Sequence, residues 1–136
     1  MSPKIIHSKL MLLYEVLADF KPHITATREK QDDAHYEIER QAQLAVEFCI
    51  AIGRRMLTLN ELPNPETARE VFLLLGEKKI IPKKLSMLLA DSVGLRNLIV
   101  HEYGKIDYSL FFGNLEAAYG AFTHLAKLAS KFIKQT

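Results

Sequence analysis

A short segment near position 100 combines residue types that together can cut RNA. Arg96 precedes His101 by five positions, and Tyr103 follows two positions later. A guanidinium group can bind two phosphate oxygens, and an imidazole can give or take a proton near neutral pH. RNA cleavage needs a base for the 2′-hydroxyl, an acid for the leaving oxygen and a cation for the phosphorane, and none of these has to be a metal. The segment is therefore a candidate metal-independent ribonuclease site.

Arg96 and His101 do not lie on one face of an ideal helix. At about 100° per residue, positions 96 and 101 are separated by about 140° around the helix axis. The two side chains meet at one phosphate only if Arg96 swings round, if the helix loosens near His101, or if a second chain completes the site. The wide apolar surface of the long helix expected after Asp33 favours the second chain, because a two-fold dimer places two such segments face to face.

Two neighbouring residues can extend the site. Asn97 carries an amide that can orient a phosphate or fix the tautomer of the histidine. Tyr103 has a ring that can stack on a base and a hydroxyl that can be modified. A structural role is the alternative, because an isolated arginine or histidine near a helix end commonly caps or solvates the helix. Spacing alone narrowly favours that structural role.

The composition is that of one globular domain. The chain has 136 residues, 49% of them hydrophobic, and its formal net charge is only +2. We therefore expect residues 1–136 to form a single domain, and any contact with RNA to come from a local patch of charge. Cys49 is the one cysteine and lies in an apolar run, which predicts a buried thiol in a reducing cytoplasm. No stretch reads as a membrane span or a secretion signal, which also favours the cytoplasm.

Apolar residues recur at helical spacing along nearly the whole chain, which predicts an all-α fold. Leu88 and Leu110 are expected on the inner faces of the last two helices. Proline, glycine and capping residues set the expected helix boundaries. The first helix should end or bend near Pro22, one of roughly seven turns should follow Asp32-Asp33, a short one should run from Asn64-Pro65 to Gly76, another from Pro82 to Gly104, and the last from about 108 to 133.

The other polar residues do not predict a second site. The basic pairs Arg54-Arg55, Lys78-Lys79 and Lys83-Lys84 can extend an RNA path, although such pairs mostly solvate a helix face. His23, His35 and His124 have no metal-ligand spacing, so they are expected to have surface or capping roles, and no metal or cofactor is expected.

The motif resembles a known signature. Gly94-Leu95-Arg96-Asn97-Leu98-Ile99-Val100-His101-Glu102-Tyr103 is similar to the motif of HepT-like toxins, a branch of the HEPN superfamily. That motif is an arginine, four residues, a histidine, one residue and a tyrosine, and Arg96, His101 and Tyr103 match it. The resemblance extends to residues 43–47, 65–75, 81–89 and 106–107, and so covers most of the chain.

The resemblance implies a HEPN-like bundle of four to five up-and-down helices, assembled as a homodimer. Arg96 and His101 would cleave RNA at the dimer interface, with Asn97 and Glu47 as orienting or phosphate-contact residues. The implied partner is a minimal nucleotidyltransferase (MNT) antitoxin of a type VII-like toxin–antitoxin system, which transfers AMP from ATP to Tyr103. A nucleotide attached beside Arg96 would occupy the anion site and silence the toxin.

One position departs from the family pattern. Members often carry a second acidic residue a turn after the glutamate that corresponds to Glu47, whereas residues 50–53 here are Ile-Ala-Ile-Gly. An alternative from another functional class is a non-catalytic helical dimer that binds a nucleotide or a nucleotidyltransferase through Arg96 and His101. Metal-free RNA cleavage that is lost when Arg96 or His101 is replaced would distinguish the two functions.

Overall fold

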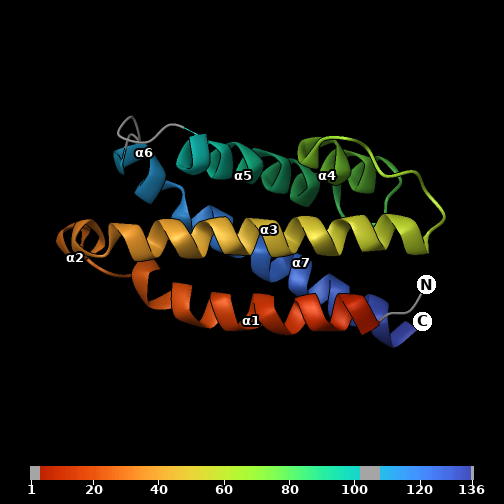
Figure 1. Ribbon diagram of the computed structural model, residues 1–136, viewed down its shortest axis with the longest axis horizontal. Coiled ribbons are helices and arrows are strands. Elements are labelled where there is room, and N and C mark those ends of the chain that lie inside the picture. The colour runs from red at the N-terminus through yellow and green to blue at the C-terminus, as the bar shows by residue number, and fades with distance from the viewer. Residues whose placement is uncertain (1–3, 102–107, 136) are drawn as a thin grey trace.

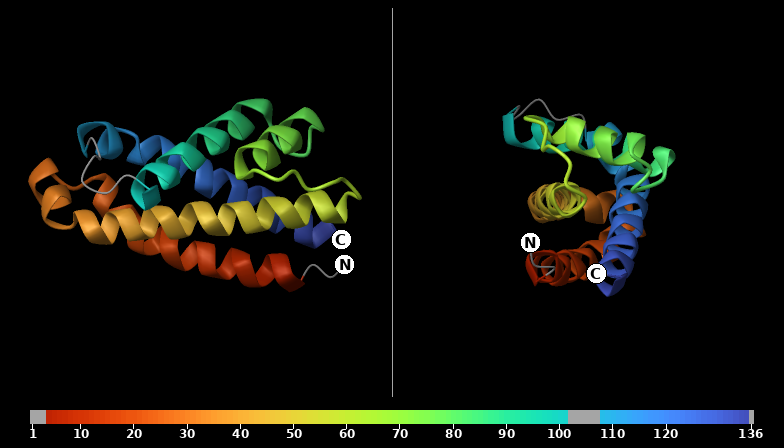
Figure 2. Two further views of the ribbon diagram at one scale, coloured as in Figure 1. Left: turned by 45° about the horizontal axis from the view of Figure 1, so that its top comes forward. Right: turned by 90° about the vertical axis from the view of Figure 1, so that its right-hand side faces the viewer.

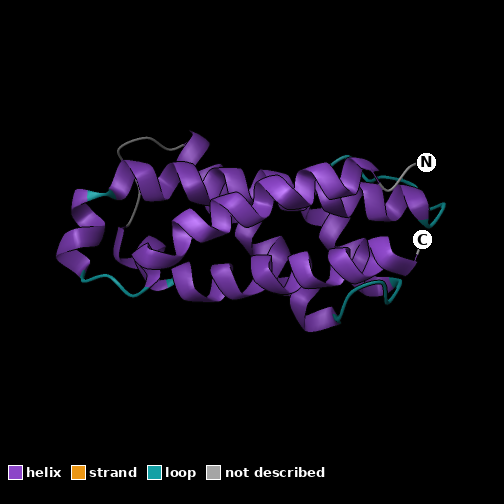
Figure 3. Cartoon of the chain, turned by 90° about the horizontal axis from the view of Figure 1, so that it is seen from below, coloured by secondary structure: helices purple, strands orange, loops and turns teal. Residues whose placement is uncertain are grey.

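The computed structural model describes the backbone of residues 4–101 and 108–135 and the side chains of residues 6–94 and 108–133. Within these ranges every regular element is a helix, as predicted (Figures 1 and 3). None of these helices has both the length and the apolar character needed to cross a membrane. The helices are α1 (Lys4–Ile24), α2 (Arg28–Asp33), α3 (His35–Leu59), α4 (Ala68–Glu77), α5 (Lys83–His101), α6 (Tyr108–Gly113) and α7 (Leu115–Gln135).

The long helices form an up-and-down bundle. α1 and α3 lie side by side and run in opposite directions, and α4 and α5 lie along the other edge of α3 (Figure 1). α7 crosses one side of this row and contacts α1, α3 and α5 (Figure 2). α6 lies at the end of the bundle where α2 joins α3, whereas α1 begins and α7 ends at the opposite end. Because α7 contacts α1, α3 and α5, the last helix packs against helices from the first half and the middle of the sequence.

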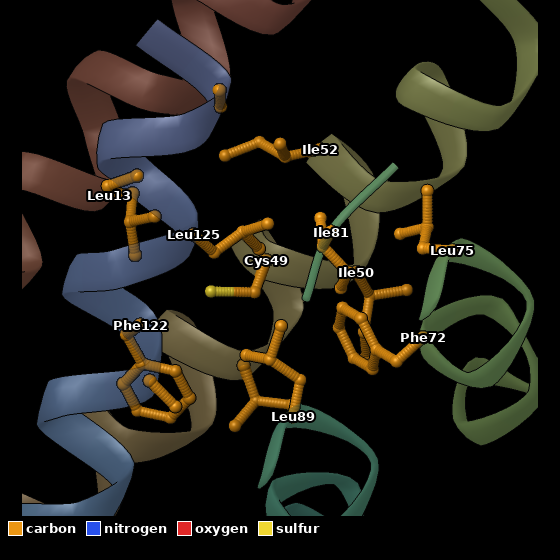
Figure 4. Packing of buried hydrophobic residues seen from close by; sticks show 14 of the residues in the cluster. Leu13, Cys49, Ile50, Ile52, Phe72, Leu75, Ile81, Leu89, Phe122 and Leu125 are labelled. Carbon is orange, nitrogen blue, oxygen red and sulfur yellow. The ribbon is translucent and has the colours of Figure 1, made fainter. Parts of the chain in front are cut away.

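The main hydrophobic core joins α1, α3, α4, α5 and α7. Phe72 of α4 and Phe122 of α7 are completely buried, and Leu89 of α5 and Cys49 of α3 lie between them (Figure 4). A second, smaller cluster attaches α6 to α1 and α3 through the two adjacent phenylalanines of α6. This second cluster consists of Phe20, Ile38, Ala42, Phe111, Phe112 and Leu115.

Cys49 is a buried thiol, as predicted. Burial raises the pKa of this thiol well above its ordinary value, and only the thiolate reacts readily. We expect the folded protein to react with a disulfide reagent such as DTNB no faster than it unfolds, and urea above the unfolding midpoint to restore the rate of a free cysteine. Rapid labelling of the folded protein would contradict this and would show that α3 opens locally.

The start of α3 differs from the prediction. Asp32 and Asp33 form the last turn of α2 and do not cap α3. A separate helix exists here because the Thr27 hydroxyl accepts a hydrogen bond from the backbone N–H of Lys30 at 3.2 Å. Ala34 then precedes α3 and makes no side-chain capping bond. The length of α3 is nevertheless the predicted seven turns, since it has 25 residues.

The start of α4 also lies later than predicted. Thr67 caps this helix, because its hydroxyl accepts the backbone N–H of Glu70 at 3.2 Å. Asn64 instead donates to the hydroxyl of Thr58 at 2.9 Å, near the end of α3. Arg54 donates to the carbonyl oxygen of Pro65 at 2.8 Å, so this arginine secures the connection between α3 and α4.

The predicted last helix is divided into α6 and α7 at Asn114. The Asn114 side-chain amide donates to the carbonyl of Leu110 at 2.7 Å, and the Asn114 carbonyl accepts the N–H of Ala118 at 3.0 Å. The same residue thus closes one helix and opens the next. Leu110 is 60% exposed and Leu88 is 38% exposed, so the prediction that both face the core was wrong. Leu110 faces outward because α6 buries its two phenylalanines instead.

Candidate active site

α5 carries the Arg96…His101 segment in its last two turns. The helix starts directly after Pro82, whose carbonyl accepts the N–H of Ser86 at 3.0 Å. Leu85, Leu89 and other buried residues hold α5 in the main core. The motif therefore extends from a helix whose first three turns are firmly packed.

The backbone of α5 fixes the angular positions of residues 96 and 101 around the helix axis. At about 100° per residue, position 96 lies about 20° from the buried Leu89 around the helix axis, and position 101 about 120° from it. Around the helix axis, the Cα position of residue 96 is thus close to that of Leu89, and the Cα position of residue 101 is farther from it. The helix is continuous through His101, so the offset that favours a site completed by a second copy is retained. The side chains of Arg96, Asn97 and His101, and Tyr103 as a whole, lie outside the described residues.

A hollow of about 380 Å³ opens beside α5, directly before the motif. Its walls include Leu88, Ser92 and Gly94 of α5 and Phe111 and Ala118 from α6 and α7. The hydroxyl of Ser92 already donates to the carbonyl of Leu89 at 2.6 Å. Asp91 and Asn114 also line the hollow, so its walls are partly polar and include a carboxylate, which would repel a phosphate.

A buried carboxylate joins the start of α3 to the start of α6. Glu39 is 8% exposed, and its Oε2 lies 2.8 Å from Nδ1 of His35. The hydroxyl of Tyr108 donates to the same Oε2 at 3.2 Å, and its ring packs edge-on against His35. Burial and the Glu39 carboxylate raise the pKa of Tyr108 above its ordinary value, so the hydroxyl keeps its proton. We call His35, Glu39 and Tyr108 the Glu39 cluster.

Sequence reasoning missed this cluster. It gave His35 only a surface or capping role and assigned Glu39 no role. The four-residue spacing of His35 and Glu39 along α3 was the available signal, since side chains at that spacing meet on a helix. Tyr108 is 69 positions from Glu39, so only the packing of α6 against α3 brings it into the cluster.

Glu47 does not join the Glu39 cluster. It is exposed on α3, and its carboxylate accepts a hydrogen bond from the amide of Gln43 at 3.5 Å, one turn earlier. Nothing among the described residues links it to α5. In the same part of the chain, no three His, Cys, Asp or Glu side chains are grouped so that they could hold a metal ion.

Comparison with known sequences gives a consistent picture. The model of the family described as "Ribonuclease HepT-like" matches residues 12–128. An mRNA nuclease HepT of Shewanella oneidensis is 34% identical over 68 residues, which is 50% of this chain. A tRNA nuclease HepT of Aphanizomenon flos-aquae is 38% identical over 69 residues, which is 51% of this chain. The chain spans about half the length of these two curated relatives, 51% and 47% respectively.

Solved structures share the fold. A tri-AMPylated HEPN toxin of Shewanella oneidensis, in complex with MNT antitoxin, matches with a TM-score of 0.83 at 23% identity, over 93% of this chain and 97% of that chain. The cytosolic protein YutE of Bacillus subtilis, of unknown function, matches with a TM-score of 0.81 at 18% identity, over 96% and 89% of the two chains. The predicted HEPN-like helical bundle is confirmed.

Proposed function

Because this chain belongs to the ribonuclease HepT-like family, we propose that it is a metal-independent endoribonuclease toxin of a HEPN/MNT toxin–antitoxin system. The observation that carries the proposal is the family match over residues 12–128, which includes Arg96 and His101 at the end of α5. Residues 1–136 form one domain in this proposal. We place the domain in the cytoplasm. It acts there as a homodimer, because the angular offset between Arg96 and His101 favours a cleft that two copies complete.

Arg96 and His101 divide the cleavage chemistry between them. Arg96 binds the scissile phosphate and stabilises the extra negative charge of the phosphorane. His101 transfers protons while the 2′-oxygen attacks phosphorus and the bond to the 5′-oxygen breaks. The products are a 2′,3′-cyclic phosphate and a 5′-hydroxyl, so no water or metal enters this step. Asn97 orients the phosphate or the imidazole, and Glu47 contributes only as an orienting group.

The direct test uses purified protein in EDTA with an RNA that is labelled at one end. Cleavage is expected without added metal, and it should leave a 2′,3′-cyclic phosphate on the upstream fragment. An RNA with a 2′-deoxyribose at the cleaved position should remain intact, because the attacking oxygen is missing. If cleavage depends on magnesium, or if the deoxy-substituted RNA is cut equally well, the proposed chemistry is wrong. A dimer that cuts no RNA would indicate the non-catalytic binding role instead.

The proposed partner is an MNT nucleotidyltransferase that silences the toxin. It would transfer AMP from ATP to the Tyr103 hydroxyl, with release of pyrophosphate and of the phenolic proton. The added nucleotide is anionic, and Tyr103 is seven positions from Arg96. A tethered phosphate near the arginine would therefore compete with RNA for the same cation.

Modification of Tyr103 gives a separate prediction. After co-expression with an MNT nucleotidyltransferase, intact mass spectrometry should show AMP adducts on the wild-type chain and none on Tyr103→Phe. The Tyr103→Phe variant should retain RNA cleavage and should no longer be silenced. Tyr36→Phe is the matched control, because Tyr36 is 79% exposed on α3 and lies outside the motif. Adducts that persist on Tyr103→Phe would contradict the assignment.

A further inference from the structure

A hollow of about 650 Å³ opens where α4 turns into α5. Its apolar walls include Leu73 of α4, Ile80 and Pro82 of the turn, and Met87 of α5. We call this hollow the α4–α5 groove. Leu73 is 38% exposed and Met87 is 53% exposed, so both helices present a large apolar side chain to solvent at the groove. Covering these side chains with another apolar surface would release the water around them, which favours binding.

The turn that forms the groove is fixed by the fold. The backbone N–H groups of Ile80 and Ile81 both donate to the carbonyl of Leu75, at 3.0 and 3.3 Å. Lys79 has a φ of 59°, the left-handed conformation in which helices commonly end. Ile81 is 2% exposed and lies in the main hydrophobic core (Figure 4). The groove therefore exists before any partner binds, which lowers the cost of ordering it on binding.

Positive charge is concentrated at the same turn. Residues 77–84 carry a net charge of +3, from four lysines and one glutamate, whereas the rest of the chain carries −1 because the total is +2. Lys79, Lys83 and Glu77 line the groove. All four lysines are exposed, and none of them takes part in an ion pair among the described residues. An anionic partner can thus bind here without breaking a described ion pair.

The apolar groove and the lysines together select the chemistry of a partner. RNA supplies phosphates but no aliphatic surface, and no aromatic ring on which a base could stack is found among the described residues that line the groove. A membrane surface is flat, whereas this surface is hollowed. An amphipathic helix with an apolar stripe and flanking carboxylates matches both the apolar walls and the lysines. We propose that the α4–α5 groove is a docking site for an acidic amphipathic helix of a partner protein.

The groove lies at the start of α5, whereas the Arg96…His101 segment lies at its end. Lys83 precedes Arg96 by 13 positions, which corresponds to about 20 Å along the helix axis. The docking site is therefore a surface distinct from the proposed ribonuclease site. It does not depend on the proposed function and can be tested without RNA cleavage.

The test uses the full chain and a fluorescein-labelled peptide of about 18 residues, or five helical turns. This peptide has leucine along one helical face and glutamate on both sides of it. We expect saturable binding in fluorescence anisotropy below about 1 mM peptide, with NMR amide shifts concentrated in residues 73–87. A peptide of the same composition with its leucines dispersed around the helix should bind roughly 10-fold more weakly. If the patterned peptide does not bind at about 1 mM, the proposal is overturned.

Charge reversal in the groove tests the contribution of the lysines. Lys79→Glu combined with Lys83→Glu should weaken peptide binding roughly 10-fold or more, because like charges then face each other. Lys127→Glu combined with Lys131→Glu is the matched control, since both lysines are exposed on α7 and the net charge changes equally. The control should bind the peptide within about twofold of the wild-type protein. Equal weakening by both pairs would show a general attraction between charges and would overturn a specific groove.

Leu73→Ser combined with Met87→Ser tests the apolar contribution. Both side chains are exposed in the free protein, so the variant should unfold within a few degrees of the wild-type protein while binding the peptide roughly 10-fold more weakly. A 2′-O-methyl RNA oligonucleotide and vesicles of phosphatidylcholine with phosphatidylglycerol are the competing ligands. If either of them moves the amide resonances of residues 73–87 and the peptide does not, the groove binds phosphates and the helix-docking proposal is wrong.

Discussion

His101→Ala is expected to reduce kcat for RNA cleavage by roughly 10²- to 10⁴-fold, because it removes the group that we propose transfers protons at both oxygens. Arg96→Ala should reduce kcat by about 10²- to 10³-fold, since it removes the cation that we propose stabilises the phosphorane. Arg96→Lys keeps the charge but loses bidentate binding, so its activity should lie between that of the wild-type protein and that of Arg96→Ala. Single-turnover cleavage rates at saturating enzyme give these values directly.

Two exposed residues outside the motif provide matched controls for these variants. His124 lies on the exposed face of α7, and Arg69 makes only a surface ion pair with Asp91 at 3.4 Å. Exposed ion pairs contribute little to stability, so Arg69→Ala should fold normally. Because both residues are exposed and lie outside the motif, His124→Ala and Arg69→Ala should cleave RNA at nearly the wild-type rate. All variants should elute with the wild-type protein in size-exclusion chromatography. Wild-type activity in either motif variant would rule out the assigned site.

Gly76→Ala is expected to lower the free energy of unfolding by about 1 kcal/mol, because overpacking the core costs about 2 kcal/mol and the higher helix propensity of alanine offsets about half of that cost. A Cβ atom at position 76 would lie 2.2 Å from Oγ and 2.5 Å from Cβ of Ser86. Ser86 is buried, and its hydroxyl is engaged with the carbonyl of Lys83 at 2.7 Å. The overlap with a Cβ atom cannot be relieved by rotating a side chain, so α4 and α5 must move apart. That cost exceeds the gain of about 1 kcal/mol from replacing glycine in a helix.

Gly120→Ala serves as the control for this prediction. Position 120 lies inside α7, is exposed, and has no atom within 4 Å of the added Cβ. Alanine should therefore stabilise the protein by about 0.5 to 1 kcal/mol through helix propensity alone. Urea denaturation of both variants gives the comparison. Gly76→Ala with Ser86→Gly should recover part of the loss, and equal effects at positions 76 and 120 would contradict the predicted overlap.

The number and order of the long helices could be predicted because each buries a stripe of apolar residues with helical period. The helix ends were harder, because several residues compete for the same backbone groups. Asn64 and Thr67 are both good caps, and the choice of Thr67 depends on Asn64 being occupied by Thr58. The division at Asn114 follows from Gly113-Asn114, a pair that can end a helix and start another, but the apolar pattern continues across it.

The candidate site was predictable only in part, for a different reason. Residue type and spacing make Arg96 and His101 candidates, and their assignment stays a prediction that the family match over residues 12–128 supports. The Glu39 cluster, by contrast, depends on where α6 packs, and no local pattern places Tyr108 beside Glu39. The prediction that Leu88 faces the core was wrong for a similar reason. Leu88 lines the hollow between α5, α6 and α7 and is partly exposed there, and this depends on how α6 and α7 pack.

The arrangement of the first and last helices determines where other molecules can be attached. α1 begins beside the end of α7, at the end of the bundle farthest from α6 (Figures 1 and 2). An affinity tag, a fluorescent protein or a surface tether fused before α1 or after α7 would therefore leave the end near α6 accessible. A chain immobilised through either end would present the last turn of α5 to RNA or to a partner enzyme in solution.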